Sequence, residues 1–159
     1  MNPRTPTHLL SFDPRAFRWS GIGRSDYKSG SGDVRGMSWK GVSRWVLASP
    51  ETVAADYELR YFEIEPGGYS SLEKHRHVHF VVVLRGHGRA LVGEHVHDLS
   101  PFDALHVPAL TPHRWLGEGD IEPFGFLCPV DRERDRPQPL DDGEWDALRA
   151  NPATARFVF

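Results

Sequence analysis

The stretch from Gly67 to Gly86, GGYSSLEKHRHVHFVVVLRG, holds most of what decides the fold of this chain. It opens on a Gly-Gly pair after a proline, which is a turn signal. It closes with an apolar, valine-rich run from Phe80 to Leu84 and a further glycine. Consecutive β-branched residues bounded by glycines are typical of a buried β-strand.

Outward from this stretch, residues 57–130 repeat the same pattern of short apolar runs separated by Gly, Pro and Asp turns. We expect strands near 57–64, 70–75, 79–85, 88–92, 95–99, 104–107, 113–116 and 123–129. Many short strands at this spacing are typical of an all-β sandwich or small barrel. Strand 79–85 is apolar on both faces, so both faces must be covered. The N-terminal region or a second subunit would cover it, and we expect a homodimer.

The region before the strands, residues 1–56, is rich in Gly, Ser, Pro and Trp and has one strand-like piece at about 43–47. We expect it to be an irregular extension that packs on the barrel or on a dimer partner.

The region after the strands, residues 131–159, begins with alternating charges that are typical of a solvated linker. Asp141 or Asp142 can cap a helix that runs to about Ala150, with Glu144 completing a capping box. One short C-terminal helix and a tail are therefore expected.

Composition excludes several classes of function. The 159 residues carry a net charge of −3, which offers no basis for binding nucleic acid or an anionic membrane. The single cysteine, Cys128, excludes an intrachain disulfide and a multi-cysteine metal site. The first residues lack the apolar segment of a signal peptide, and we expect a cytoplasmic protein.

Histidines are the unusual feature, because eight of the nine lie between His75 and His113. Alternate residues on a strand are roughly 6.6 Å apart and residues four apart roughly 13 Å. Ligands at 75 and 79 can therefore share one metal ion only if the chain bends between them, and a further ligand must come from elsewhere. His113, after the rigid segment Pro108–Pro112, is the natural distant ligand.

At this point the sequence resembles the cupin superfamily, in both of its motifs. The first motif is usually Gly, five residues, His-x-His, three or four residues, Glu, six residues and Gly. Anchored on Gly67 and Gly86, it places Glu73 and His75 at the two histidine positions and His79 at the glutamate position. The resemblance implies a double-stranded β-helix, the jelly-roll barrel of the cupins, over residues 57–130.

The second motif is usually Gly, five residues, Pro-x-Gly, two residues, His, three residues and Asn. Its proline and histidine are Pro108 and His113, while Phe102, Leu110 and Gly117 replace two glycines and an asparagine. These replaced positions serve turns, so they bear on the shape of the loops more than on the metal.

The resemblance implies a mononuclear metal site at Glu73, His75, His79 and His113. Imidazole with carboxylate suits iron or manganese first, with nickel, copper or zinc as alternatives. A competing set of His75, His77 and His113, with Val81 at the glutamate position, requires a two-residue shift against both glycines.

Around the metal we expect a small organic substrate to contact Arg60, Tyr61, Trp115 and Phe126. A buried guanidinium at Arg60 could anchor a carboxylate or a phosphate. The cupin resemblance is compatible with three functions: an oxygenase, which we favour, a lyase or isomerase that uses the ion as a Lewis acid, and a non-catalytic binding protein.

Overall fold

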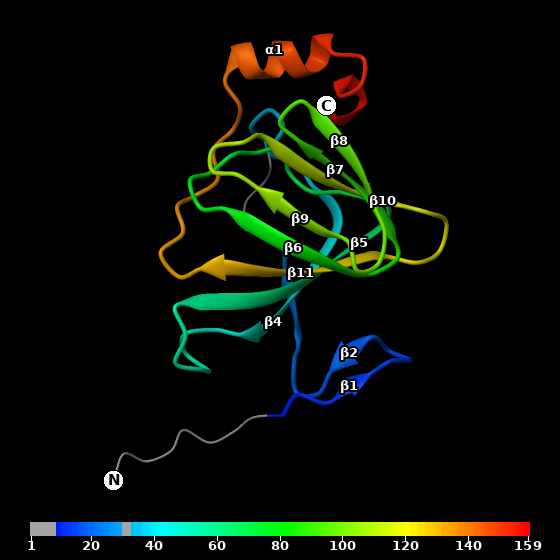
Figure 1. Cartoon of the computed structure of the whole chain (residues 1–159), viewed down its shortest axis with the longest axis vertical. Coiled ribbons are helices and arrows are strands. Elements are labelled where there is room, and N and C mark those ends of the chain that lie inside the picture. Colours follow the sequence, from blue (N-terminus) through cyan, green and yellow to red (C-terminus); the bar gives the residue numbers. More distant parts are fainter. Residues whose placement is uncertain (1–8, 30–32) are drawn as a thin grey trace.

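The computed structural model describes residues 9–29 and 33–159 and shows an antiparallel sheet that curls into a barrel, with a helix at one end (Figure 1). The strands are β1 (Phe12–Asp13), β2 (Arg18–Trp19), β3 (Arg24–Asp26), β4 (Lys40–Ala48), β5 (Tyr57–Tyr69), β6 (His79–Arg85), β7 (His87–Val92), β8 (His95–Leu99), β9 (Ala104–Val107), β10 (His113–Glu118) and β11 (Phe124–Asp131). The helix α1 spans Asp142–Ala150, and a short 3-10 helix spans Ala155–Phe157.

The main sheet has the order β8-β7-β10-β5-β11-β6-β9, with β4 joining β5 and β3 joining β4. The long strand β5 connects the two sides of the barrel, because it pairs with β4 and β11 and then, at Tyr69, with β10. All of these pairings are antiparallel. The expected all-β jelly-roll fold is confirmed.

Several stretches differ from the expected strands. The first is β5, which runs through Gly67 and Gly68 to Tyr69, where a turn after residue 64 was expected. Residues 70–75 do not form a regular strand; Glu73 makes an isolated bridge to His113, and Lys74 makes one to Gln138. The chain turns there instead, and Asp135 accepts hydrogen bonds from the backbone N–H groups of Arg76 and His77. In the N-terminal region, β4 is a full nine-residue strand of the sheet, longer than the expected piece at 43–47.

The barrel interior is built from the inward faces of its strands, including Val81 and Val83 of β6 and Phe124 and Phe126 of β11. Gly88 on β7 makes this packing feasible, since a Cβ at that position would lie 2.4 Å from the ring of Phe124. Any larger residue there would clash with a ring that is fully buried.

Helix α1 covers one end of the barrel through a second apolar cluster that includes Trp145, Leu148, Leu72 and Phe157. The predicted capping box is confirmed: Asp141 accepts from the Glu144 backbone N–H, and Glu144 accepts from that of Asp141. Across the described parts of the chain, every helix is too short or too polar to cross a bilayer.

Two loops adopt the conformation that the motif glycines would supply. Phe102 and Leu110 have φ angles of +74° and +58°, in the left-handed region that favours glycine. The loop geometry is therefore kept although the glycines are replaced, at a cost in backbone strain.

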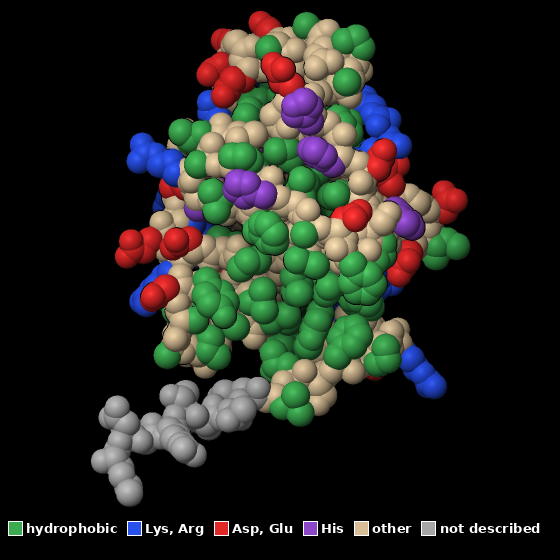
Figure 2. All heavy atoms as spheres, viewed as in Figure 1, with side chains coloured by type: hydrophobic (Ala, Val, Ile, Leu, Met, Phe, Trp, Pro, Cys, Tyr) green, Lys and Arg blue, Asp and Glu red, His purple; other side chains and the backbone are tan. Residues whose placement is uncertain are grey.

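The outward face of β6 is only partly covered. The aromatic side chains of Phe17 and Trp19 pack on Tyr61 of β5, whereas Phe80 on β6 remains 51% exposed. Figure 2 shows hydrophobic side chains gathered over the lower half of the molecule in this view. The homodimer stays a prediction.

Candidate metal centre

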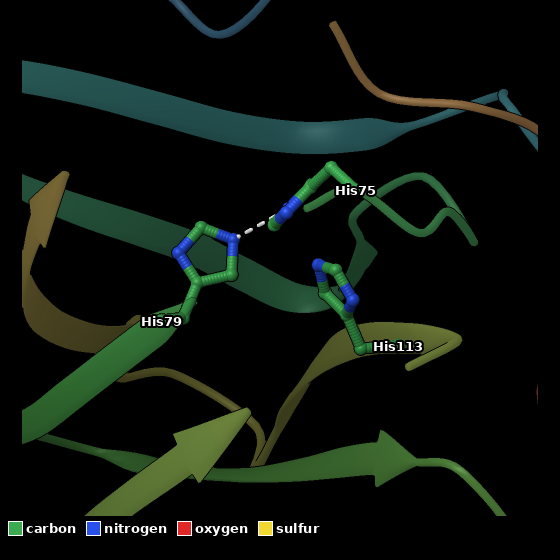
Figure 3. Close-up of side chains that lie close together, drawn as sticks. All are labelled: His75, His79 and His113. Carbon is green, nitrogen blue, oxygen red and sulfur yellow. Dashed lines mark hydrogen bonds between the residues drawn. The ribbon is translucent and has the colours of Figure 1, made fainter. Parts of the chain in front are cut away.

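Three histidines from separate segments meet inside the barrel (Figure 3). His75 lies in the loop after β5, His79 begins β6 and His113 begins β10. Each contributes a ring nitrogen, and these three atoms lie within 4.8 Å of one another. The bend at residues 76–77 brings together two residues that a straight strand would hold far apart, as the spacing required.

Hydrogen bonds orient the three rings. The Nδ1 atom of His75 is 2.7 Å from the His77 carbonyl oxygen, and that of His113 is 2.9 Å from the Thr111 carbonyl oxygen. A carbonyl can only accept, so both rings carry their proton on Nδ1 and keep a free electron pair on Nε2.

The ring of His79 is oriented by a contact with the side chain of Cys128. Its Nδ1 lies 3.2 Å from the Cys128 Sγ, and that thiol lies 3.7 Å from the Pro129 carbonyl oxygen. If the thiol donates to this carbonyl, its sulfur accepts the Nδ1 proton of His79, and the third Nε2 is then free.

The Nε2 atoms of His75 and His79 are 2.9 Å apart. Two unshared electron pairs at that distance repel unless a proton or a cation lies between them. Three imidazoles that can all present Nε2 to one point fit a divalent transition metal, and a bond from Nδ1–H to a fixed acceptor is the usual support of such a ligand.

The protonation states agree with this role. Burial, with the charge of neighbouring His113, lowers the pKa of His75 to about 4 and that of His79 to about 2. Burial also lowers the pKa of His113, against the opposing effect of Glu73. All three rings are therefore neutral at pH 7, which is the form that binds a metal.

Glu73 lies beside His113 but has other partners. Its Oε2 accepts hydrogen bonds from the Ser71 hydroxyl, at 2.5 Å, and from the Lys28 ammonium. Burial favours the neutral acid, yet Lys28 and His113 outweigh burial and lower the pKa of Glu73. The carboxylate is ionised within the same cavity, and its role as a fourth ligand stays a prediction.

His77, the member of the competing set, supports His75. Its ring stacks on the His75 ring with centroids 3.6 Å apart, and its Nδ1 lies 2.9 Å from the Asp135 carboxylate. His75, His77 and Asp135 form a second group of neighbouring ligand atoms that shares His75 with the first.

The three histidines line a central cavity of about 220 Å³. Of the four expected substrate contacts, Arg60, Trp115 and Phe126 line this cavity. Tyr61 lies on the opposite face of β5, where its hydroxyl donates to Glu63 and its ring packs against Trp45. Neighbouring residues of a strand point to opposite faces, so Arg60 and Tyr61 cannot both face the cavity.

Several residues of the cavity wall lie outside the matched motifs. They are Tyr27, Lys28, Arg44, Arg134 and Asp135. The alternating charges after β11 indicated only a solvated linker, and nothing local distinguished Arg134 and Asp135 from the rest of that segment. Cys128 is buried as expected, and burial raises the pKa of its thiol to about 12.

The curled antiparallel barrel with clustered histidines defines the class of this protein. The family model described as a cupin domain matches residues 60–129, and the chain belongs to this family. A cupin 2 conserved barrel domain protein from Rhodopseudomonas palustris superposes with a TM-score of 0.80 at 36% identity, over 95% of this chain and 99% of that one. A cupin-2 domain structure from Rhodospirillum rubrum gives a TM-score of 0.76 at 36% identity, over 94% and 95% of the two chains.

A more specific relative is also found. The chain is 41% identical over 142 residues to the 1-methylthio-D-xylulose 5-phosphate methylsulfurylase of Rhodospirillum rubrum. The match covers 89% of this chain and 86% of that enzyme.

Proposed function

We propose that this protein is a metal-dependent enzyme that removes the methylthio group from a methylthio-ketose phosphate such as 1-methylthio-D-xylulose 5-phosphate. The observation that carries the proposal is the convergence of three neutral imidazoles in the central cavity. The relative named as a methylsulfurylase, which matches most of both chains, supports this choice of substrate.

The metal would be held by His75, His79 and His113, with Glu73 as the expected fourth ligand. Iron or manganese remains the expectation for its identity. When bound, such an ion acts as a Lewis acid, which polarises a ketone carbonyl and makes negative charge on the adjacent carbon less costly. In this substrate the carbonyl is at C2, next to the carbon that carries the sulfur.

The reaction balances with a thiol as acceptor. A thiolate attacks the sulfur of the methylthio group, the bond from C1 to sulfur breaks, and C1 takes the electron pair and then a proton. The products are a methyl disulfide and a 1-deoxyketose phosphate, so the ketose is reduced and the thiol is oxidised.

The protein's own residues provide the surroundings for this chemistry. The hydrogen bonds from Nδ1 to fixed carbonyls hold His75 and His113 in one tautomer and orientation. Phe62, Trp115 and Phe126 supply apolar wall, which limits the access of water to the reacting centre.

The test measures metal content and turnover together. The purified chain should carry stoichiometric transition metal, and proton NMR should follow loss of the substrate's S-methyl signal in the presence of dithiothreitol. His75→Ala and His113→Ala should lose the metal and the activity, while the control His95→Ala, on exposed β8, should keep both. Metal without turnover of this substrate would contradict the proposal.

The oxygenase that the sequence favoured is the second candidate. Three imidazoles with one carboxylate would leave open positions on an octahedral ion for substrate and dioxygen. Consumption of dioxygen during turnover, measured with an oxygen electrode, would favour it over thiol-dependent removal of the methylthio group.

A further inference from the structure

Three arginines contribute to the wall of the central cavity: Arg44 from β4, Arg60 from β5, and Arg134 from the segment after β11. Arg44 on β4 lies opposite Phe62 on β5, and Phe62 is two residues after Arg60 on that strand. Arg44, Arg60 and Phe62 therefore share the inward face of the sheet.

The guanidinium groups outnumber the carboxylates that pair with them. Glu58 binds Arg60 through Nε at 2.6 Å and Arg134 through Nη2 at 3.3 Å. Arg44 has no side-chain hydrogen bond or ion pair within the described residues 9–29 and 33–159, and its buried Nε has no acceptor there. Glu58 alone therefore cannot neutralise the three arginines.

The other charged groups of the cavity are engaged elsewhere. Asp135 accepts from the His77 ring and from backbone N–H groups, and Lys28 is bound to Glu73. Lys28 and Glu73 neutralise each other, whereas the ionised Asp135 lowers the positive charge of the cavity by one, so the three arginines against Glu58 and Asp135 leave an excess of one positive charge. A partly buried guanidinium without an acceptor is costly, so the arrangement favours an anion from outside.

We propose that Arg44, Arg60 and Arg134 form the binding site for the phosphate group of a phosphomonoester substrate. A phosphomonoester carries a charge of about −1.5 to −2 at pH 7, which compensates the excess positive charge, and it offers three acceptor oxygens to the three guanidinium groups where a carboxylate offers two. Its oxygens also accept the paired N–H groups that a guanidinium presents in one plane. This proposal extends the proposed function by naming the residues that recognise the substrate's phosphate.

The position of the arginines beside the histidines suits such a substrate. Cys128 is the partner of Arg60 across the β5–β11 ladder, and its sulfur contacts the His79 ring. Arg60 and His79 line the same cavity. One ligand can therefore reach both groups, and a ketose 5-phosphate has its carbonyl at C2 and its phosphate at C5.

The test measures binding of inorganic phosphate by isothermal titration calorimetry. Arg44→Gln is the cleanest variant, because it removes a guanidinium without breaking an ion pair. It should weaken phosphate binding at least about tenfold, the effect expected from loss of a charge-assisted hydrogen bond. The control Arg89→Gln, on the outside of the barrel, should bind like the parent. Binding should persist in His113→Ala, which excludes phosphate held by the metal.

Several results would overturn the proposal. They are failure of the parent to bind phosphate, equal phosphate affinity in Arg44→Gln and Arg89→Gln, and acetate that binds as tightly as phosphate. The proposed function is tested separately by turnover. If phosphate binds through the arginines but the methylthio-ketose phosphate is not converted, only the proposed function fails. If conversion occurs with an unchanged KM in Arg44→Gln, only the phosphate site fails.

Discussion

Acid should destabilise the metal-free protein through His75 and His79. Burial and the charge of His113 lower the pKa of these rings to about 4 and about 2, against about 6.5 in an unfolded chain. Below pH 6.5 the unfolded state therefore binds protons that the folded state does not. The stability that the neutral rings contribute is present above pH 6.5 and is lost as the pH falls toward the folded-state pKa values.

The magnitude follows from the size of the shifts. Each pH unit below 6.5 costs about 1.4 kcal/mol per ring, so a change from pH 7.5 to 5.0 removes about 2 kcal/mol for each histidine and about 4 kcal/mol for His75 and His79 together. His113, whose pKa burial also lowers, adds to this loss. Glu73 does not offset this loss, because its carboxylate is ionised in both states above pH 5. The assay is urea unfolding of chelator-treated protein at the two pH values, followed by tryptophan fluorescence.

Two variants distinguish proton uptake by His75 and His79 from a general sensitivity of the protein to acid. His79→Gln cannot take up the proton, so the difference between the two pH values should fall by about 2 kcal/mol. His95→Gln, on exposed β8, should leave the difference unchanged. A free energy of unfolding that is equal at both pH values, or a full pH effect in His79→Gln, would refute the reasoning.

Three further predictions concern the fold. Phe102→Gly and Leu110→Gly should each raise the free energy of unfolding by about 0.5–1 kcal/mol, because glycine relieves the left-handed strain of side chains that are 82% and 49% exposed; lower stability in thermal melts would contradict this. Asp141→Ala should lower the free energy of unfolding by about 1 kcal/mol through loss of the helix cap, and an unchanged urea midpoint would argue against it. Phe80→Glu, on β6, should convert the expected homodimer to a monomer in sedimentation velocity, whereas Ile121→Glu, exposed on the loop between β10 and β11, should not.

Features that depend on residues close together in the sequence could be predicted from it. The capping box depends on Asp141 and Glu144 three residues apart, and it formed as expected. The strands of the barrel follow from alternating side chains and turn residues, and the motif spacing identified the three histidines that meet.

Other features needed the packed molecule. The strand expected at 70–75 did not form, because its backbone bends to bring His75 toward His79 and Asp135 holds the turn that follows. Whether Arg60 or Tyr61 faces the cavity depended on which face of β5 turns inward. The sequence pattern does not show this, because β5 carries large side chains on both faces.

The sequence by itself determined the all-β cupin barrel and the three histidines that meet in it, because periodicity and motif spacing act over a few residues to a few tens of residues. Only the tertiary structure decided what surrounds them. Lys28, Arg44 and Arg134 come from three segments far apart in the chain, and pairing of β4 and β11 with β5 brings Arg44 and the segment that carries Arg134 to Arg60. Charge balance inside a cavity is a property of that assembly, and no single segment of the sequence carries it.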